Sequence, residues 1–199
     1  MIAVRTISFK DLDALVLVHI SAFQGFFLTK LGVSFLKYYY RSVLKSKQGI
    51  LLGAFIDEIL IGFCAACRRS AGFNASLIRD NLLGFILIGF KLIFTRPLAM
   101  LRLIKNLSKT GEHDDNGEYA ELMSIGVYKT VQNSGAGKLL LTSLESLLKK
   151  DGIRRLSLTT DVENNENTLA FYSKAGFKEM YMFVTYPQRK MHRLIKDLL

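Results

Sequence analysis

Cysteine and histidine are scarce in this sequence: its 199 residues include two cysteines and three histidines. Cys64 and Cys67 form a C-x-x-C pair, a spacing found in redox motifs and in half of a zinc site. A second cysteine pair is absent, and the histidines are scattered. The pair lies in an apolar run with strand character, where odd spacing places the two side chains on opposite faces. We therefore expect buried structural thiols, no metal and a reducing compartment.

Charged residues are also few, and acidic ones fewest. They make up 22% of the chain, with 17 Asp and Glu against 27 Lys and Arg, which gives a net charge of +10. Half of the residues are hydrophobic, which excludes a disordered chain. A basic excess suits nucleic acid, an anionic membrane surface or an anionic cofactor. Arginine-rich runs are missing, so we expect no nucleic-acid partner.

The N-terminus lacks the apolar stretch of a signal peptide, so we expect a cytoplasmic protein, with membrane association left open. The chain shows neither an internal repeat nor a linker. Its length suits a single folding unit with a substantial core. We therefore expect residues 1–199 to form one domain.

Apolar periodicity predicts alternating strands and helices. In the first part it indicates a strand at 2–7, helices at 11–23 and 33–45, and a hairpin that turns at Asp57-Glu58. In the second part it indicates strands at 119–128, 154–160 and 177–186, helices up to about 150 and at 164–175, and a last strand from about 190. This order predicts an α/β core.

Residues 71–110 interrupt that pattern with a very apolar segment. A membrane span needs about 20 mostly apolar residues, but Lys91 divides this run and Arg96-Pro97 follow. Two helices that break near 95–97 fit better, with Pro97 in the first turn of the second. Residues 81–105 carry four cations and no acid. Their apolar face could be covered by the core, by a homodimer partner or by a peripheral membrane contact.

A glycine loop, VQNSGAGKLL, follows the strand at 119–128 and opens a helix. Free N–H groups and the partial positive charge at a helix N-terminus bind phosphate groups. A Walker loop would need Gly at Gln132 and Ser or Thr at Leu139. A Rossmann loop would need a third glycine, which is missing.

The pattern that remains, Q-x-x-G-x-G at Gln132, Gly135 and Gly137, resembles the acetyl-CoA loop of the GNAT superfamily of N-acetyltransferases. A second motif of that family matches NENTLAFYSKAGF, where it aligns Asn165, Phe171, Tyr172, Gly176 and Phe177. The resemblance extends from about 120 to 183. It implies a mixed central β-sheet of about six to seven strands flanked by helices. The 71–110 segment would then be an extra helical insert between the third and fourth strands.

The resemblance also implies a set of cofactor contacts and no metal. The loop would hold the pyrophosphate of acetyl-CoA, the co-substrate, with Gln132, Asn133, Ser134, Gly135, Ala136, Gly137 and Lys138. The strand before the loop would pair with pantetheine through Ile125, Gly126 and Val127, and one of its N–H groups would meet the acetyl carbonyl. Asn165 would bond the pantetheine arm, cap its helix, or do both.

Tyr172 matches the family's general acid, which gives a proton to the leaving thiolate. For the base we expect Glu121, because its even spacing from Val127 places both side chains on one face of the strand. A salt-bridged Glu121 is the alternative. His19, close to the aromatic turn QGFFLTKLG, is a second candidate, and a packed histidine is its alternative.

These features predict an enzyme that transfers acetyl from acetyl-CoA directly to the primary amine of a small molecule. Phe26 and Phe27 of the aromatic turn would contact the acceptor. They suggest an apolar or sugar-like group, such as an amino sugar of surface polysaccharide synthesis. A small amine or a protein N-terminus is the alternative acceptor. A non-catalytic CoA-binding module is an alternative of another class.

Overall fold

The structure, a computed structural model, describes residues 1–95, 97–98 and 115–198. Its strands are β1 (Ala3–Thr6), β2 (Gly49–Ile56), β3 (Ile59–Cys67), β4 (Ala120–Val127), β5 (Arg155–Asp161), β6 (Lys178–Thr185) and β7 (Arg189–Asp197). Its helices are α1 (Leu12–Ala22), α2 (Phe27–Lys30), α3 (Val33–Lys45), α4 (Phe73–Asp80), α5 (Leu82–Thr95), α7 (Ala136–Lys150) and α8 (Glu166–Lys174). Two 3-10 turns, η1 (Phe9–Asp11) and η2 (Lys129–Val131), lie between them.

The seven strands form one mixed sheet in the order β1-β2-β3-β4-β5-β7-β6. Within the described residues, β4 and β5 are paired in parallel and the other strand pairs are antiparallel. The predicted α/β fold with six to seven strands is therefore confirmed. The strand predicted from about residue 190 is β7, which lies between β5 and β6.

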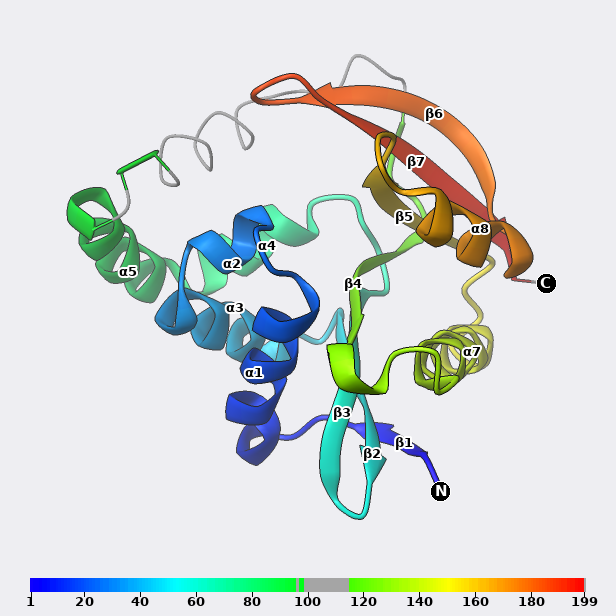
Figure 1. Ribbon diagram of the computed structural model, residues 1–199. Coiled ribbons are helices and arrows are strands. Elements are labelled where there is room, and N and C mark those ends of the chain that lie inside the picture. Colours follow the sequence, from blue (N-terminus) through cyan, green and yellow to red (C-terminus); the bar gives the residue numbers. More distant parts are fainter. Residues whose placement is uncertain (96, 99–114, 199) are drawn as a thin grey trace.

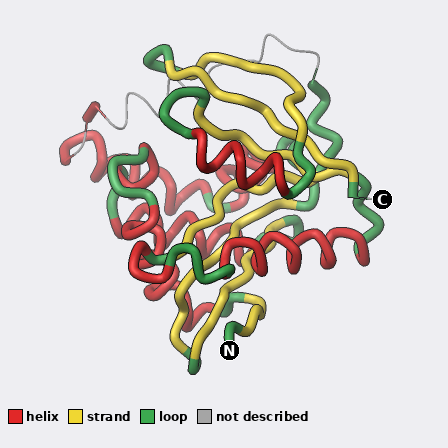
Figure 2. The backbone as a smooth tube through the Cα atoms, turned by 45° about the vertical axis from the view of Figure 1, so that its right-hand side comes forward, coloured by secondary structure: helices red, strands yellow, loops and turns green. Residues whose placement is uncertain are grey.

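Helices cover both faces of the sheet (Figures 1 and 2). On one face, α1 and α3 pack on β3 through a core that includes Leu15, Leu36 and Phe63. On the other, α7 packs through a core that includes Leu140 and Leu144. Strands β2 and β3 are buried on both faces, which explains why their sequences are continuously apolar.

The two cysteines follow the predicted arrangement. Cys64 belongs to the core on the α7 side and Cys67 to the core on the α1 side, so the side chains point to opposite faces of β3. Both are buried free thiols. The hairpin between β2 and β3 also turns where predicted, with positive φ at Asp57 and Glu58. That geometry is typical of a type I′ turn.

The aromatic turn contains an element that the sequence did not indicate. Residues 27–30 form the short helix α2, flanked by Gly25 and Gly32 with φ of 80° and 92°. Four residues are too few to show helical periodicity, so a turn was predicted there. The positive φ of both glycines isolates this one helical turn.

The described part of the 71–110 segment contains α4 and α5, and α5 ends at Thr95. The second predicted helix lies mostly outside the described residues. One face of α5 packs with Phe85, Ile88 and Leu92 against α2 and α3. Its other face exposes large apolar side chains, at Leu82, Leu83, Ile86, Leu87, Phe90, Ile93 and Phe94. In the part of the chain that the structure describes, no helix is both long enough and apolar enough to cross a membrane.

Candidate active site

Strands β4 and β5 diverge after a short parallel pairing (Figure 1), and the interval between their facing edges is called the opening below. The two strands pair only between Ala120–Leu122 and Leu156–Leu158. Beyond that, β4 continues along β3 to Val127, and β5 continues along β7 to Asp161. The facing edges of β4 and β5 therefore carry backbone groups that no other described strand uses.

The backbone N–H groups of Ile125 and Val127 point into this opening. The N–H of Tyr128 donates to the carbonyl of Ile61 on the β3 side, at 2.9 Å. Backbone groups of successive strand residues point to alternate edges, so Gly126 also points to β3. Ile125 and Val127 then point to the opposite edge. Two of the three predicted backbone contacts thus face the opening, while the N–H of Gly126 faces β3.

Position 126 has no room for a side chain, which is why a glycine is needed there. A Cβ at this position would lie 2.8 Å from the ring of Phe23 and 2.9 Å from the Cβ of Ala22. Both neighbours belong to the end of α1, so the absence of a side chain lets α1 lie directly against β4. The end of α1 and the edge of β4 together form one wall of the opening.

The predicted phosphate loop ends at the N-terminus of α7. Asn133 and Gly135 have φ of 65° and 85°, and the carbonyl of Gly135 accepts a helical hydrogen bond from the N–H of Leu139 at 3.0 Å. The N–H groups of residues 136–138 precede that bond and have no partner within the helix. A Cβ at Gly135 would meet nothing within 4 Å, so this glycine is required for its φ.

These elements line one cleft of about 1110 Å³ that reaches from this loop to α1 and α2. It brings together most of the predicted site: Phe26, Phe27, Ile125, Gly126, Val127, Gln132, Asn133, Gly135, Gly137, Lys138, Asn165 and Tyr172. Three predicted residues are not in the lining. Ser134 is exposed, Ala136 is buried in the core under α7, and Glu121 lies further along β4.

The sequence patterns did not identify several charged residues of the cleft lining. Lys196 on β7 donates to Glu145 on α7 at 2.7 Å, and Arg189 on β7 forms an ion pair with Asp161 on β5. Lys196 and Arg189 are 51 and 28 residues from these partners in the sequence, so local spacing could not predict either pair. Lys174, which also lines the cleft, lies inside the α8 motif and could have been noticed. Such cations suit the phosphate groups of a cofactor.

Asn165 stands at the N-cap position of α8, but its side chain does not cap the helix. Its Nδ2 donates to Thr160 Oγ1 at 2.7 Å and to the carbonyl of Asp161 at 2.8 Å. The amide therefore ties the start of α8 to the end of β5. The predicted capping role is wrong, and Oδ1 is left as an acceptor for a group in the cleft.

Tyr172 lies in α8 between two aromatic rings, Phe171 and Phe177, whose centroids are 5.2 Å and 5.5 Å away. It is 6% exposed and lines the cleft. Burial, with a smaller effect of Cys64, raises the pKa of its hydroxyl well above 10. The phenol therefore keeps its proton at neutral pH, as a general acid must before it acts.

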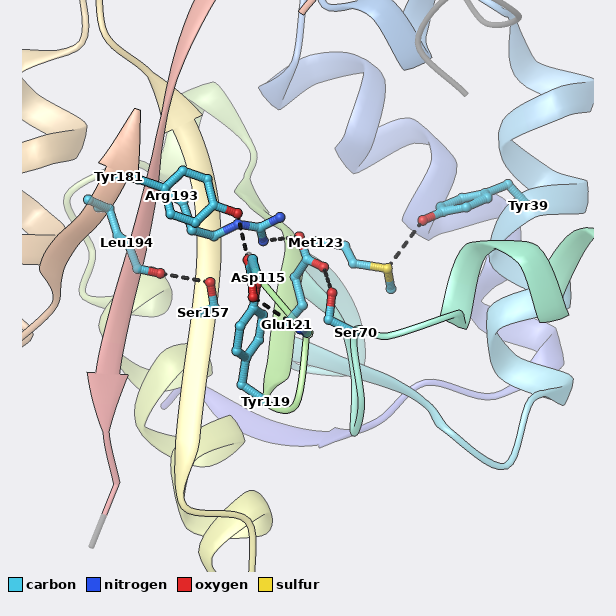
Figure 3. Close-up of polar contacts among 11 residues, drawn as sticks. Tyr39, Ser70, Asp115, Tyr119, Glu121, Met123, Ser157, Tyr181, Arg193 and Leu194 are labelled. Carbon is cyan, nitrogen blue, oxygen red and sulfur yellow. Dashed lines mark hydrogen bonds and ion pairs between the residues drawn. The ribbon is translucent and has the colours of Figure 1, made fainter. Parts of the chain in front are cut away.

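Glu121 does not share a face with Val127, so the geometric argument for its role is wrong. Leu122 pairs with Ala66 and Ser124 with Ala65, which leaves Met123 as a β-bulge. A bulge adds one residue and reverses the alternation of side chains beyond it. Figure 3 shows the Glu121 carboxylate between two partners. It accepts from Arg193 at 2.7 Å and from Ser70 Oγ.

We predict that Glu121→Gln lowers stability more than rate. The side chains of Glu121 and Arg193 are 18% and 15% exposed, and removal of one partner leaves the other charge poorly compensated. We expect a loss of about 3 kcal/mol in the free energy of unfolding, measured with urea. The matched control Glu118→Gln, which breaks an exposed pair with Arg69, should cost less than about 1 kcal/mol. A rate loss above a hundredfold in folded Glu121→Gln would restore its role as the base.

His19 is a buried residue of α1 that also lines the cleft. Its Nδ1 lies 2.7 Å from the hydroxyl of Tyr40 on α3. Its Nε2 is buried and has no hydrogen-bond partner in the described part of the chain. Burial lowers the pKa of His19 to about 4, so the ring is neutral at pH 7.

This shift predicts a pH-dependent contribution to stability. The folded pKa of about 4 lies below the unfolded value of about 6.5, so between these values the unfolded chain binds the proton first. Stability should fall as the pH falls from about 6.5 to 4, by about 3 kcal/mol. The free energy of unfolding of His19→Gln, measured with urea between pH 6.5 and 4, should therefore fall less than that of the wild type, by about this amount. Identical pH profiles for both proteins would show that His19 is not buried as a neutral ring.

Comparison with known proteins agrees with this geometry. The family model of the acetyltransferase (GNAT) family matches residues 19–177. A search of curated protein sequences found no match. Among solved structures, the ribosomal-protein-S18-alanine N-acetyltransferase from Escherichia coli has a TM-score of 0.65 at 16% identity, covering 100% of this chain and 94% of that one. The PaiA N-acetyltransferase from Thermoplasma acidophilum, in complex with coenzyme A, has a TM-score of 0.57 at 19% identity and 99% coverage of both chains.

The chain belongs to the acetyltransferase (GNAT) family, since the family model covers most of its length. It is an acyltransferase of the class that uses acetyl-CoA as donor. The identities to the solved structures are low and show a shared fold.

Proposed function

We propose that this enzyme transfers acetyl from acetyl-CoA directly to a primary amine bound at the α1–α2 end of the cleft. One observation carries the proposal: a single cleft is lined by Ile125 and Val127 of β4, by the first turn of α7 and by Tyr172, which can offer it backbone N–H groups, a helix N-terminus and a phenol hydroxyl. The first suits a thioester carbonyl, the second a pyrophosphate and the third a thiolate leaving group.

Each of these groups has its own role in the proposed reaction. The amine nitrogen attacks the thioester carbon, and the N–H groups of Ile125 and Val127 stabilise the oxyanion. The C–S bond then breaks, and Tyr172 gives its proton to the sulfur. The proton that the nitrogen loses passes to water, and solvent returns one to Tyr172. The products are the acetylated amine and CoA with a free thiol.

The proposed donor site runs along α7 and α8. Free N–H groups at residues 136–138 and the glycine loop before them would hold the pyrophosphate, with Lys138 and Lys174 adding positive charge. Asn165 Oδ1 would accept from an amide N–H of the pantetheine arm. This site requires no metal.

The proposed acceptor site lies beside Phe26 and Phe27, which line the other end of the cleft. Phe26 is 44% exposed, and the guanidinium of Arg189 lies 5.6 Å from its ring centre. An aromatic wall with polar groups at its rim suits a sugar-like or apolar body. We propose an amino sugar of surface polysaccharide synthesis, with a small amine or a protein N-terminus as the alternative. The buried free thiols support a cytoplasmic location.

Turnover of acetyl-CoA against a panel of amines tests this function. The panel should contain nucleotide-linked and lipid-linked amino sugars, small alkyl amines and peptides with free N-termini. Amine-dependent release of CoA supports the enzyme, and the preferred amine identifies the class of acceptor. Binding of acetyl-CoA without release for any amine would favour a non-catalytic CoA-binding module.

We also propose that a second copy of the chain or an anionic lipid surface covers the exposed face of α5. This face is too large and apolar to remain in water without a function or a risk of aggregation. The net charge of +10 would favour anionic lipid.

Two double variants separate the faces of α5. Phe85→Asp with Ile88→Asp places carboxylates against α2 and α3 and should lower the melting temperature by more than 5 °C, since buried unpaired charges cost several kcal/mol. Leu87→Asp with Phe90→Asp alters only exposed residues and should leave the melting temperature nearly unchanged. It should abolish self-association, measured by sedimentation, or binding to anionic vesicles. If the Leu87 and Phe90 variant changes neither self-association nor vesicle binding, the exposed face of α5 binds neither a second copy nor anionic lipid.

A further inference from the structure

The Nε2 atom of His19 is a buried polar atom next to the proposed reaction site. His19 is 2% exposed, and its ring lies 4.9 Å from Phe23 and 6.1 Å from Phe63, centre to centre. Tyr40 occupies its Nδ1 at 2.7 Å. Buried ring nitrogens nearly always have a partner, and no described residue supplies one to Nε2, which leaves this position for a bound group.

The cleft is where that group would be found. His19, Ala22 and Phe23 all line it, and a Cβ on Gly126 would touch the last two. His19 is therefore one helical turn from the point where α1 meets β4. The neighbouring strand positions, Ile125 and Val127, direct their N–H groups into the same opening.

The ring carries no charge. Burial alone lowers its pKa to about 4, and no charged side chain of the described residues contributes to the shift. The groups that face it are Phe23 on α1, Tyr40 on α3, Phe63 on β3 and, through a bond to Tyr40, Ser124 on β4. Burial also raises the pKa of Tyr40 well above 10, so this partner stays neutral.

We propose that His19 Nε2 accepts a hydrogen bond from the acceptor amine in its neutral form, so that the enzyme selects weakly basic amines that carry an aromatic or apolar body. This inference rests on the proposed function and specifies its substrate class. The proposal assigns the tautomer in which Nδ1–H donates to the hydroxyl of Tyr40, because only that tautomer leaves a lone pair on Nε2 for an amine N–H.

The surroundings disfavour an ammonium ion. Its hydration would be lost against Phe23, Phe26 and Phe27, and a neutral imidazole cannot replace it. Among the described residues, the lining contains two carboxylates, and both are already paired: Asp161 with Arg189 through both oxygens, and Glu145 with Lys196. An α-amino group has a pKa near 8 and an alkyl amine near 10.4, so at pH 7 the free-base fraction differs by roughly a few hundredfold.

Two amines with the same phenylethyl body test the selection. Phenylalaninamide carries a weakly basic amine and phenethylamine a strongly basic one. We expect kcat/KM to favour phenylalaninamide by roughly a hundredfold at pH 7, with the ratio shrinking as the pH rises to 10. Equal values at pH 7, or no turnover of either amine while another amine in the panel reacts, would overturn the assigned class. No turnover with any amine would instead refute the proposed function.

Variants of His19 separate binding of the amine from a structural role. His19→Leu should lower kcat/KM for phenylalaninamide at least tenfold without changing the KM for acetyl-CoA, and His19→Gln, which keeps an acceptor oxygen, should recover part of the loss. His192→Gln makes the His-to-Gln change at a half-buried histidine outside the cleft lining and should leave kcat/KM unchanged. Equal rates for wild type and His19→Leu would overturn the proposal. If His19→Leu does not fold, Tyr40→Phe, which removes the hydroxyl that holds Nδ1 and bonds to Ser124, should still raise the KM of the amine. An unchanged KM would overturn the proposal.

Discussion

Tyr172→Phe should slow the chemical step of acetyl transfer by about 10²–10⁴-fold while acetyl-CoA still binds. The change removes one oxygen and keeps the ring that packs between Phe171 and Phe177. Without the hydroxyl, the thiolate must leave unprotonated or wait for a proton from water. Single-turnover experiments measure this step directly, because product release can hide it in the steady state.

A second tyrosine provides the control. Tyr119 is 4% exposed, and its hydroxyl bonds to Asp115, away from the cleft lining. Tyr119→Phe should cost stability but leave the single-turnover rate within a few-fold of wild type. If Tyr172→Phe also keeps the wild-type rate, Tyr172 has only a packing role and another group must protonate the sulfur.

Gly135→Asp should abolish the rise in melting temperature that acetyl-CoA gives to the wild type. Gly135 lines the cleft at the N-terminus of α7, where the pyrophosphate is expected, and a carboxylate there would repel it. Because a Cβ at this position meets nothing within 4 Å, the effect would not arise from a clash in the free protein.

Gly135→Asn is the matched control for this charge. Asn has nearly the shape of Asp and tolerates the φ of 85° about as well, so both variants share the backbone strain. Gly135→Asn should weaken the binding of acetyl-CoA modestly and Gly135→Asp strongly. The difference in affinity between the two variants should become smaller at high salt. Equal binding by the two variants would mean that the pyrophosphate lies elsewhere.

The order of elements was predictable because local patterns in this chain agree with its tertiary structure. Helix α3 begins and ends at the predicted residues, Val33 and Lys45, and the hairpin turns at Asp57-Glu58. The strand, loop and helix around Gly135 were clear for the same reason: apolar alternation ends at Val127 and helical spacing begins after the glycine. Four-residue α2 is too short to give such a signal.

The details of the site depended on features that simple periodicity does not show. The bulge at Met123 reverses the faces of β4, so counting from Val127 placed Glu121 on the wrong side. The pairing of Arg189 with Asp161 depends on β7 returning beside β5. Tertiary packing of three elements creates the environment of His19, which no spacing predicts.

The most direct test of the central claim measures CoA thiol release and acetylated amine together, in one reaction with purified protein, acetyl-CoA and the amine panel. The account predicts that an accepted amine accelerates thiol release and that one acetylated amine forms for each thiol. It also predicts that Tyr172→Phe lowers both rates equally. Acetyl-CoA that binds the cleft but releases no more thiol with any amine than without one would contradict the account.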